Sequence, residues 1–318
     1  MKLFNISKII LIFIASFIGI IKASFLTQQI EELKKVKEDL DEYNNANCIS
    51  RNISFNNKSQ LDVYFDPETM EQKKPVVINI HGGSWYNNDK MNSVSTGLLL
   101  HENDFVAVIP NYVLFPYGQV EDMINDVYTS IKWTFDNIDK FGGDTNNITV
   151  VAHSSGAHLL ALTLIKAALS RKNGNTTLVP LPDIKRVVLM NGPYEFDEAM
   201  LKNINKEENE DNEDNLFKEI SLAILGSNDS CPIDILKEYD DNTITTFGVE
   251  KFNIVYASGD NVVSETSANS LMAQMKRTCP STDIQYFYLE GIGHDGIVNG
   301  IREKDEEIQT SFLLLIQN

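Results

Sequence analysis

Short apolar runs that alternate with amphipathic helical segments constrain the fold of this chain more than any other feature. Residues 75–80 form a short apolar run that ends in glycines, which is typical of a buried strand. Between residues 119 and 140, apolar side chains recur at helical spacing, and two glycines follow. Strand followed by helix, repeated along the chain, predicts a mostly parallel twisted sheet with helices on both faces, which is an α/β fold.

The same pattern predicts where the domain begins and where it is interrupted. The expected strands are residues 61–65, 75–80, 105–109, 148–152, 184–190, 252–257 and 284–289, and the expected helices are residues 119–140, 156–171, 264–276 and 303–316. Residues 24–60 form a lead-in that is helical near residues 30–42, and residues 61–318 form one large domain. Residues 194–239 are long, acidic and mixed, so we expect a cap-like insertion above the sheet.

Charge excludes one class of partner. The formal net charge is −18, whereas a nucleic-acid-binding surface needs clustered lysine and arginine. Part of the negative charge is local, because residues 207–214 hold six acids in eight positions. Such a run cannot bury apolar surface, so we expect a solvated, poorly ordered loop there.

The N-terminus resembles a targeting segment. Two lysines precede an apolar run at residues 9–21, and the small residues Ala23 and Ser24 follow it. This order is typical of a cleaved secretory signal, and the run is shorter than the roughly 20 residues that span a bilayer. An uncleaved membrane anchor is the alternative, since Phe25 and Leu26 extend the apolar stretch. We expect residues 1–23 to direct the protein to the secretory pathway, either secreted or associated with endoplasmic reticulum or Golgi membranes.

Two further features bear on that expectation. Glycosylation sequons occur at Asn52, Asn57, Asn147, Asn175 and Asn228. The cysteines are Cys48, Cys231 and Cys279, so at most one intramolecular disulfide can form, and its pairing stays open. None has the spacing of a metal ligand, and we expect all three to be structural.

The segment Ala152-His153-Ser154-Ser155-Gly156 lies between an expected strand and an expected helix. A sharp strand-to-helix turn exposes a serine above the sheet edge, and small residues must flank it because the backbone passes close to its neighbours. We predict that Ser154 is a nucleophile. Ser155 is the rival, but its register would require glycine at Ala157.

A second glycine motif, His81-Gly82-Gly83-Ser84-Trp85, directly follows the strand at residues 75–80. Acyl transfer needs backbone N–H groups that hold the oxyanion of the tetrahedral intermediate. We predict an oxyanion hole made from Gly82, Gly83 and Ser84 together with Ser155, whose amide opens a helix. The alternative is an ordinary glycine turn after a strand.

The serine needs a base, and the base needs an acid that orients it. Asp260 follows the strand at residues 252–257, and His294 follows the strand at residues 284–289. This gives the order serine, acid, histidine along the chain, which the proposed fold requires. We predict Asp260 as the acid and His294 as the base; Asp295 is the rival acid. The predicted reaction uses no metal and no cofactor.

Three residues beside these motifs have less definite roles. Trp85 and Tyr194 are expected to line the substrate pocket, although either is equally compatible with a place in the core or at its rim. His158 lies one turn into the helix after the serine, and we expect it to be a packing residue.

These motifs together resemble one branch of the α/β-hydrolases. The segment at residues 141–159, FGGDTNNITVVAHSSGAHL, is similar to prenylcysteine methylesterases, which carry FGGDPxxI and SAGAH there. Further similar positions are Asn111-Tyr112, Phe115-Pro116, Asp122-Met123 and Asp126. The resemblance covers roughly residues 76–300 and departs from the branch at Ala152, Thr145 and Ser155, none of which removes a catalytic group.

The resemblance implies an α/β-hydrolase fold and a serine esterase acting on a small-molecule or lipid-linked carboxylic ester, with the methyl ester of a prenylated cysteine as one candidate. Kynurenine formamidases share the HGGxW and SAGAH motifs, so a formamidase is an alternative, as is a broad-specificity carboxylesterase or lipase. An alternative of another class is a non-catalytic binding protein on a hydrolase scaffold.

Overall fold

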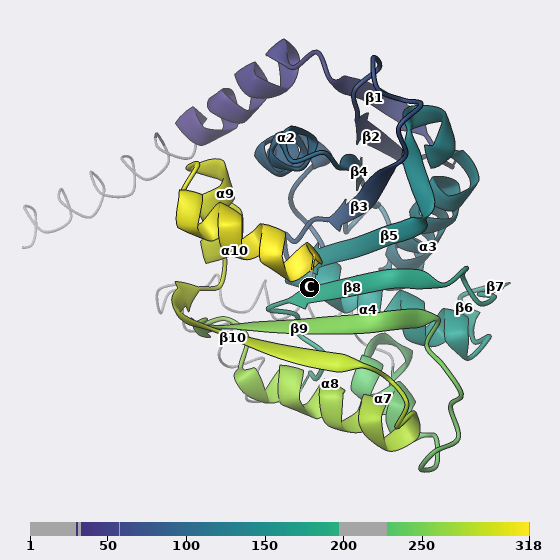
Figure 1. Cartoon of the computed structure of the whole chain (residues 1–318). Helices are drawn as coiled ribbons and strands as arrows, with labels where there is room; N and C mark the ends of the chain where they lie inside the picture. The colour runs from purple at the N-terminus through teal and green to yellow at the C-terminus, as the bar shows by residue number, and fades with distance from the viewer. Residues whose placement is uncertain (1–29, 31–32, 57, 197–227, 318) are drawn as a thin grey trace, which may run out of the picture. The chain divides into compact units, whose positions relative to one another are not determined.

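The computed structural model describes Ile30 and residues 33–56, 58–196 and 228–317. It divides into two compact units, Met1–Ala46 and Asn47–Asn318. In the first unit, residues 33–45 are helical (Figure 1), which agrees with the expected lead-in helix. The apolar run at residues 9–21 and the acidic run at residues 207–214 lie outside the described residues. Among the helices that are described, none combines the length and apolar character needed to cross a bilayer.

An eight-stranded sheet forms the centre of the second unit, with the strand order β1-β2-β4-β3-β5-β8-β9-β10. The strands are β1 (Ile49–Ser54), β2 (Gln60–Tyr64), β3 (Lys74–Ile80), β4 (Val106–Pro110), β5 (Gly143–His153), β8 (Ile184–Met190), β9 (Val249–Gly259) and β10 (Ile284–Gly293). The strands from β4 to β10 in this order pair in parallel, while β1 and β2 are antiparallel. The prediction of a mostly parallel sheet is confirmed.

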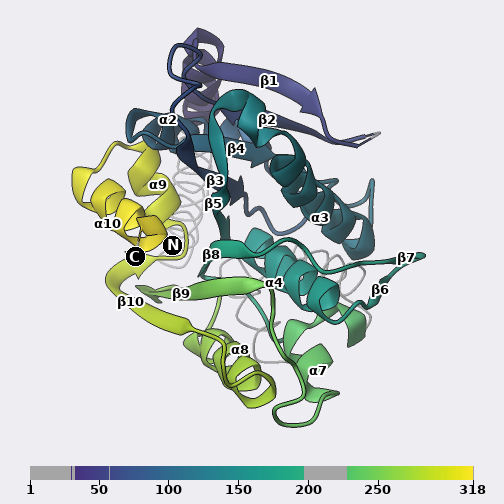
Figure 2. The same cartoon turned by 45° about the vertical axis from the view of Figure 1, so that its right-hand side comes forward.

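Helices cover both faces of this sheet, as predicted (Figures 1 and 2). One face carries α3 (Val120–Asn137), α4 (Ser155–Ala168), α7 (Pro232–Lys237) and α8 (Glu265–Thr278), and the other carries α2 (Val94–Glu102), α9 (Gly296–Arg302) and α10 (Glu306–Gln317). A small hairpin, β6 (Lys172–Asn173) and β7 (Thr176–Thr177), follows α4. Parallel strands joined by helices place all their carboxyl ends at one edge of the sheet.

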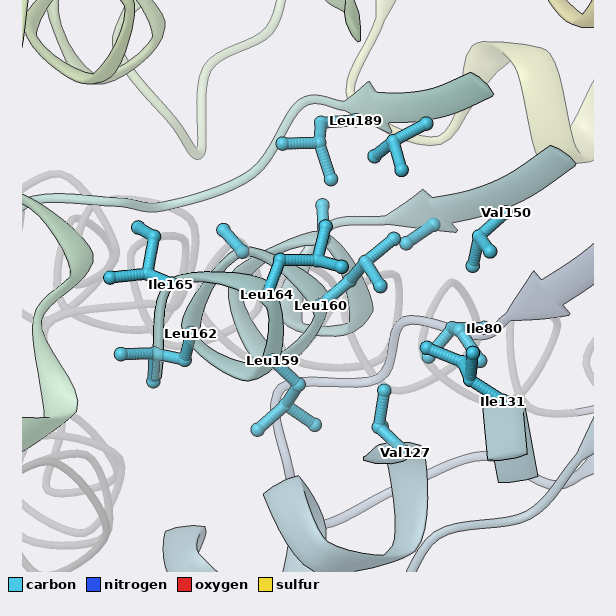
Figure 3. Close-up of a cluster of buried hydrophobic side chains, with 14 of the residues drawn as sticks. Ile80, Val127, Ile131, Val150, Leu159, Leu160, Leu162, Leu164, Ile165 and Leu189 are labelled. Carbon is cyan, nitrogen blue, oxygen red and sulfur yellow. The ribbon is translucent and has the colours of Figure 1, made fainter. Parts of the chain in front are cut away.

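Helix α4 is the most deeply buried helix of the described chain, and its burial fixes the position of the serine that precedes it. Figure 3 shows its leucines between two layers of apolar side chains. Leu160 faces Val150 of the sheet, and Leu159 faces Val127 of α3. Each fully buried leucine stabilises the fold by about 2 kcal/mol. The helix is therefore held on both sides, and its first turn is held with it.

Several elements were not expected from the sequence, among them β1, α2, α7 and α9. Strand β1 lies in the predicted lead-in, so the sheet begins earlier than residue 61. Its sequence, ISRNIS, is largely polar, and its pairing with β2 shifts register near Asn52, which has φ 57°. Helix α9 has only seven residues, which is too short to show a helical period in the sequence.

The three cysteines are free thiols in the structure. Cys48 is half-buried, whereas Cys231 and Cys279 are buried. Burial raises the pKa of Cys231 to about 11, so this thiol stays protonated at neutral pH. The expectation that the cysteines are structural fits the two buried positions.

Candidate active site

Ser154 occupies the sharp turn between β5 and α4. Its backbone has φ 51° and ψ −124°, a conformation that costs a non-glycine residue of the order of 1–3 kcal/mol. Its amide donates to the carbonyl of Met190, at the end of β8, at 2.9 Å. A Cβ atom on Gly156 would overlap the carbonyl oxygen of His81, so only glycine fits there. The strand–serine–helix turn predicted from the sequence is present.

Three side chains from separate loops meet above this turn. The Oγ atom of Ser154 lies 2.9 Å from Nε2 of His294, and Nδ1 of His294 lies 2.7 Å from Oδ2 of Asp260. Asp260 follows β9 and its side chain is fully buried, while the His294 side chain is 11% exposed. The Asp260 carboxylate accepts a hydrogen bond from Nδ1–H of His294, so the unprotonated Nε2 is left to accept the serine hydroxyl proton.

The carboxylate of Asp260 is oriented by the main chain of its own loop. Its Oδ1 atom accepts from the amides of Val262 and Val263, at 2.8 Å each. The rival acid Asp295 is 62% exposed and lies 3.8 Å from Nε2 of His153. The structure therefore brings Asp260, and not Asp295, to the histidine nitrogen.

The loop of His294 is anchored through its backbone. The carbonyl oxygen of His294 accepts from Nε2 of His153 and from Nδ2 of Asn191, at 2.8 Å each. Burial, and then the charge of His294, lower the pKa of His153 to about 4. His153 is therefore neutral at neutral pH and keeps a single ring proton for this bond.

The glycine turn after β3 lies directly against the serine. A Cβ on Gly82 would lie 3.1 Å from Cβ of Ser154. Gly83 has φ 122°, and the next two residues, Ser84 and Trp85, also have positive φ values of 52° and 66°. Three consecutive residues in this region turn the chain sharply at a point where Gly82 packs against the serine. Ser155 supplies the first amide of α4 on the other side.

Residues after β4 support the glycine turn, and sequence reasoning gave them no role. Tyr112 stacks on the ring of His81 and donates from its hydroxyl to the His81 carbonyl at 3.1 Å. Asn111 donates to Asp89 and accepts from the amide of Lys90. The similarity of Asn111-Tyr112 to the methylesterase branch was the only sequence signal that marked these residues.

Trp85 and Tyr194 are both buried. Their side chains are 3% and 1% exposed, and they belong to the hydrophobic core. The indole of Trp85 donates to Nδ1 of His158 at 3.1 Å. Of the two interpretations open from the sequence, the burial of both residues supports a place in the core.

A cavity of about 140 Å³ borders the site on the face of the sheet that carries α2, α9 and α10. Gly82, Gly83, His153 and Asp295 form its wall toward the serine. Its remaining wall is half apolar and half polar. The apolar residues are Ile80, Met190, Ile297, Val298, Ile301 and Phe312, and the polar residues are Asn79, His81, Asn88, Asn92, Ser93 and Thr96. The volume is similar to that of a cavity that holds one benzene molecule.

Within the described chain, His153, His294 and Asp295 have potential metal-ligand atoms within 4.8 Å of one another. Both ring nitrogens of His294 already contact Ser154 and Asp260. Nε2 of His153 contacts the His294 carbonyl. Binding of a metal ion to these ring nitrogens would break their hydrogen bonds. The two histidines therefore serve the hydrogen-bonded arrangement.

Curated relatives include methylesterases and other esterases. The isoprenylcysteine alpha-carbonyl methylesterase ICME of Arabidopsis thaliana is 32% identical over 137 residues, which is 43% of this chain and 32% of that protein. Esterase LipC of Mycobacterium tuberculosis is 25% identical over 250 residues, which is 74% of this chain and 56% of that protein. The matches to the first three curated relatives span between 32% and 40% of the length of those proteins.

Solved structures of esterases have a similar fold. An esterase of Pyrobaculum calidifontis matches with a TM-score of 0.66 and 17% identity, over 91% of this chain and 92% of that one. Esterase B from Lactobacillus rhamnosis matches with a TM-score of 0.63 and 14% identity, over 91% and 94% of the two chains. The family model BD-FAE matches residues 61–275. The chain therefore belongs to the BD-FAE family, and its fold is the α/β-hydrolase fold.

Proposed function

We propose that this chain hydrolyses carboxylic esters through an acyl-enzyme on Ser154, with His294 as the base and Asp260 as the acid that orients it. The observation that carries the proposal is the continuous hydrogen-bonded series from Ser154 Oγ through His294 to Asp260, with distances of 2.9 and 2.7 Å. The esterase names of its relatives and of its structural neighbours support the same activity.

The geometry suits a two-step mechanism. Nε2 of His294 accepts the hydroxyl proton of Ser154 as Oγ attacks the ester carbonyl. The amides of Gly83 or Ser84 and of Ser155 hold the oxyanion, and each such donor is typically worth about two to three orders of magnitude in rate. His294 then gives its proton to the leaving alcohol. Water attacks the acyl-enzyme by the same route in reverse, which releases the acid.

The methyl ester of an isoprenylated cysteine is the substrate that we rank first, because several of the curated relatives that this chain resembles carry that activity in their names. Three substrates separate the alternatives: a prenylcysteine methyl ester, N-formylkynurenine and p-nitrophenyl acyl esters. Higher kcat/KM for the formyl substrate would replace the esterase proposal with a formamidase. Comparable turnover of all p-nitrophenyl esters and no preference for the prenylcysteine ester would favour a broad-specificity carboxylesterase.

Labelling with a fluorophosphonate probe, followed by mass mapping of the adduct, tests the nucleophile. We expect one adduct on Ser154 in the wild-type protein and none in Ser154→Ala. Ser281→Ala is the matched control, since Ser281 is an exposed serine in the loop after α8 and should leave labelling unchanged. Absence of an adduct on the folded wild-type protein would support the non-catalytic binding protein instead, and an adduct on Ser155 would contradict the assignment of the nucleophile.

We also propose a secretory location, supported by the signal-like composition of residues 1–23. Three sequon asparagines, Asn52, Asn147 and Asn175, are exposed on the second unit and so are accessible to modification. Expression of the whole chain in eukaryotic cells should give a protein in the secretory pathway whose mass falls after removal of N-linked glycans. N-terminal sequencing would distinguish cleavage near Ala23 from retention of an anchor, and a protein found only in the cytosol would contradict the proposal.

A further inference from the structure

His158 is fully buried in α4, and both of its ring nitrogens are hydrogen-bonded. Nδ1 accepts from the indole N–H of Trp85 at 3.1 Å, and Nε2 bonds the carbonyl oxygen of Ser230 at 2.7 Å. An indole N–H can only donate and a carbonyl can only accept, so the ring proton must be on Nε2. Burial lowers the pKa of His158 to about 4, which keeps this neutral form at neutral pH.

The first of these bonds ends on the glycine turn beside the serine. Trp85 follows Ser84 directly, and both residues have positive φ values. Such a conformation persists only where surrounding contacts hold it. The carbonyl of Trp85 accepts from the amide of Phe115 at 2.9 Å, and its indole contacts the His158 ring edge-on, with centroids 5.4 Å apart. His158 supplies the polar contact that fixes the indole.

The second bond ends where the chain returns from residues 197–227. Ser230 directly precedes Cys231, the residue before α7, and Sγ of Cys231 bonds the carbonyl of Tyr194 at 3.2 Å. Phe196, on the outgoing side, lies 5.0 Å from the His158 ring between ring centroids and 6.1 Å from Trp85. His158 therefore contacts both described ends of the expected insertion as well as the glycine turn.

We propose that His158 is a positioning residue. It holds the glycine turn in place through Trp85, and it does so relative to Ser230, which lies within the expected insertion. It does not touch the reacting atoms, and its effect on the reaction rests on the proposed esterase function. A residue that only fills space would be replaceable by a side chain of similar volume. The action of a positioning residue depends on its hydrogen bonds, here the bond of Nδ1 to Trp85 and the bond of Nε2 to Ser230. Each of these bonds can be removed separately.

Two substitutions separate the bonds. His158→Asn places an amide near the position of Nδ1, where its oxygen can accept from Trp85, but it is too short to reach Ser230. His158→Gln places its amide near the position of Nε2, where it can donate to Ser230, and it removes the acceptor from Trp85. Trp85→Phe keeps one aromatic ring but removes the indole N–H together with part of the bicyclic ring.

Nuclear magnetic resonance of the indole N–H tests the contact without reference to activity. The chain has two tryptophans, so Trp133→Phe leaves Trp85 as the single indole signal of the full-length protein. We expect a slowly exchanging indole proton in this background and in His158→Asn. In His158→Gln the signal should shift upfield and exchange at least tenfold faster. An unchanged signal in His158→Gln would refute the contact on which the proposal rests.

Steady-state kinetics then test the role in the reaction. We expect His158→Gln and Trp85→Phe to lower kcat between tenfold and a hundredfold, since a 1 Å misplacement of a catalytic group costs about a hundredfold, with KM changed less than threefold. The double variant should lose no more than the larger single loss, because both changes remove the same bond. His158→Asn should retain most of the wild-type kcat.

These outcomes distinguish the two proposals. If His158→Gln loses the indole bond but keeps wild-type kcat and a wild-type melting temperature, His158 is a packing residue and the inference is wrong. If His158→Gln does not fold, Trp85→Phe carries the test alone, and wild-type kcat in that variant would also refute it. If the wild-type protein neither hydrolyses esters nor labels with fluorophosphonate, the esterase proposal fails while the indole measurement still reports on the contact.

Discussion

Replacement of Asp260 by asparagine is a sharp test of the acid, because the structure dictates which way the new amide must face. Oδ1 of Asp260 accepts from the amides of Val262 and Val263, so the asparagine oxygen has to stay at that position. Its NH2 group then faces Nδ1 of His294, 2.7 Å away in the native protein. Nδ1 becomes an acceptor, the ring proton moves to Nε2, and the histidine can no longer take the proton of Ser154.

The magnitude follows from the same argument. A serine hydrolase held in the wrong histidine tautomer loses about 10⁴ in kcat, which corresponds to about 5 kcal/mol of transition-state stabilisation. KM should change little, because the buried carboxylate does not face the substrate. Initial rates of p-nitrophenyl acetate hydrolysis measure the loss, and the melting temperature shows whether the fold is intact.

Asp295→Asn is the matched control for this experiment. Its carboxylate is mostly exposed and lies beside His153, so removal of its charge should change kcat less than about threefold. The reasoning fails if Asp260→Asn keeps more than a tenth of the wild-type kcat in a folded protein. It also fails if Asp295→Asn loses as much activity as Asp260→Asn.

Two further changes have expected effects on stability. In Gly156→Ala the new Cβ would lie 2.7 Å from the Ile80 carbonyl oxygen and closer still to that of His81, so thermal unfolding should show a loss of about 3 kcal/mol in the free energy of unfolding. Gly293→Ala is the control. Its Cβ would meet no atom closer than 3.8 Å, so this variant should unfold as the wild type does. The pKa of His158 is lowered from 6.5 to about 4, so the unfolded state binds more protons between these values, and this residue should contribute a fall of about 3 kcal/mol in the free energy of unfolding as the pH drops from 6.5 to 4. Urea unfolding at a series of pH values should show a smaller fall in His158→Asn, and parallel curves for the two proteins would contradict the assignment.

The parts of this structure that could be predicted are those with a local signal in the sequence. Buried parallel strands are short apolar runs, so β3, β4 and β8 were found close to their observed bounds, whereas β5 begins five residues before its predicted start. The serine turn and the glycine turn need small residues at fixed spacing, which a sequence displays directly. Asp260 and His294 were found because the fold places such residues after particular strands, and the structure brings both to the serine.

The parts that could not be predicted depend on contacts between distant residues. Nothing near Asn191 in the sequence indicates that its amide bonds the carbonyl of His294, 103 positions away. The partners of His158 are 73 and 72 positions away, so the helical period around it shows only that it faces the core. Trp85 was compatible with a pocket because an aromatic residue beside a glycine turn has the same local pattern whether it points inward or outward.

The anchoring of His294 has a consequence for how proteins of this kind diverge. In the described chain, its carbonyl is held by His153 at the end of β5 and by Asn191 just after β8, and both are buried. Neither partner belongs to residues 194–239, where the chain leaves the strand-and-helix alternation. Mutations that reshape that segment can therefore accumulate without moving the base away from the serine. A lineage could change what it hydrolyses many times while inheriting the same proton-transfer geometry.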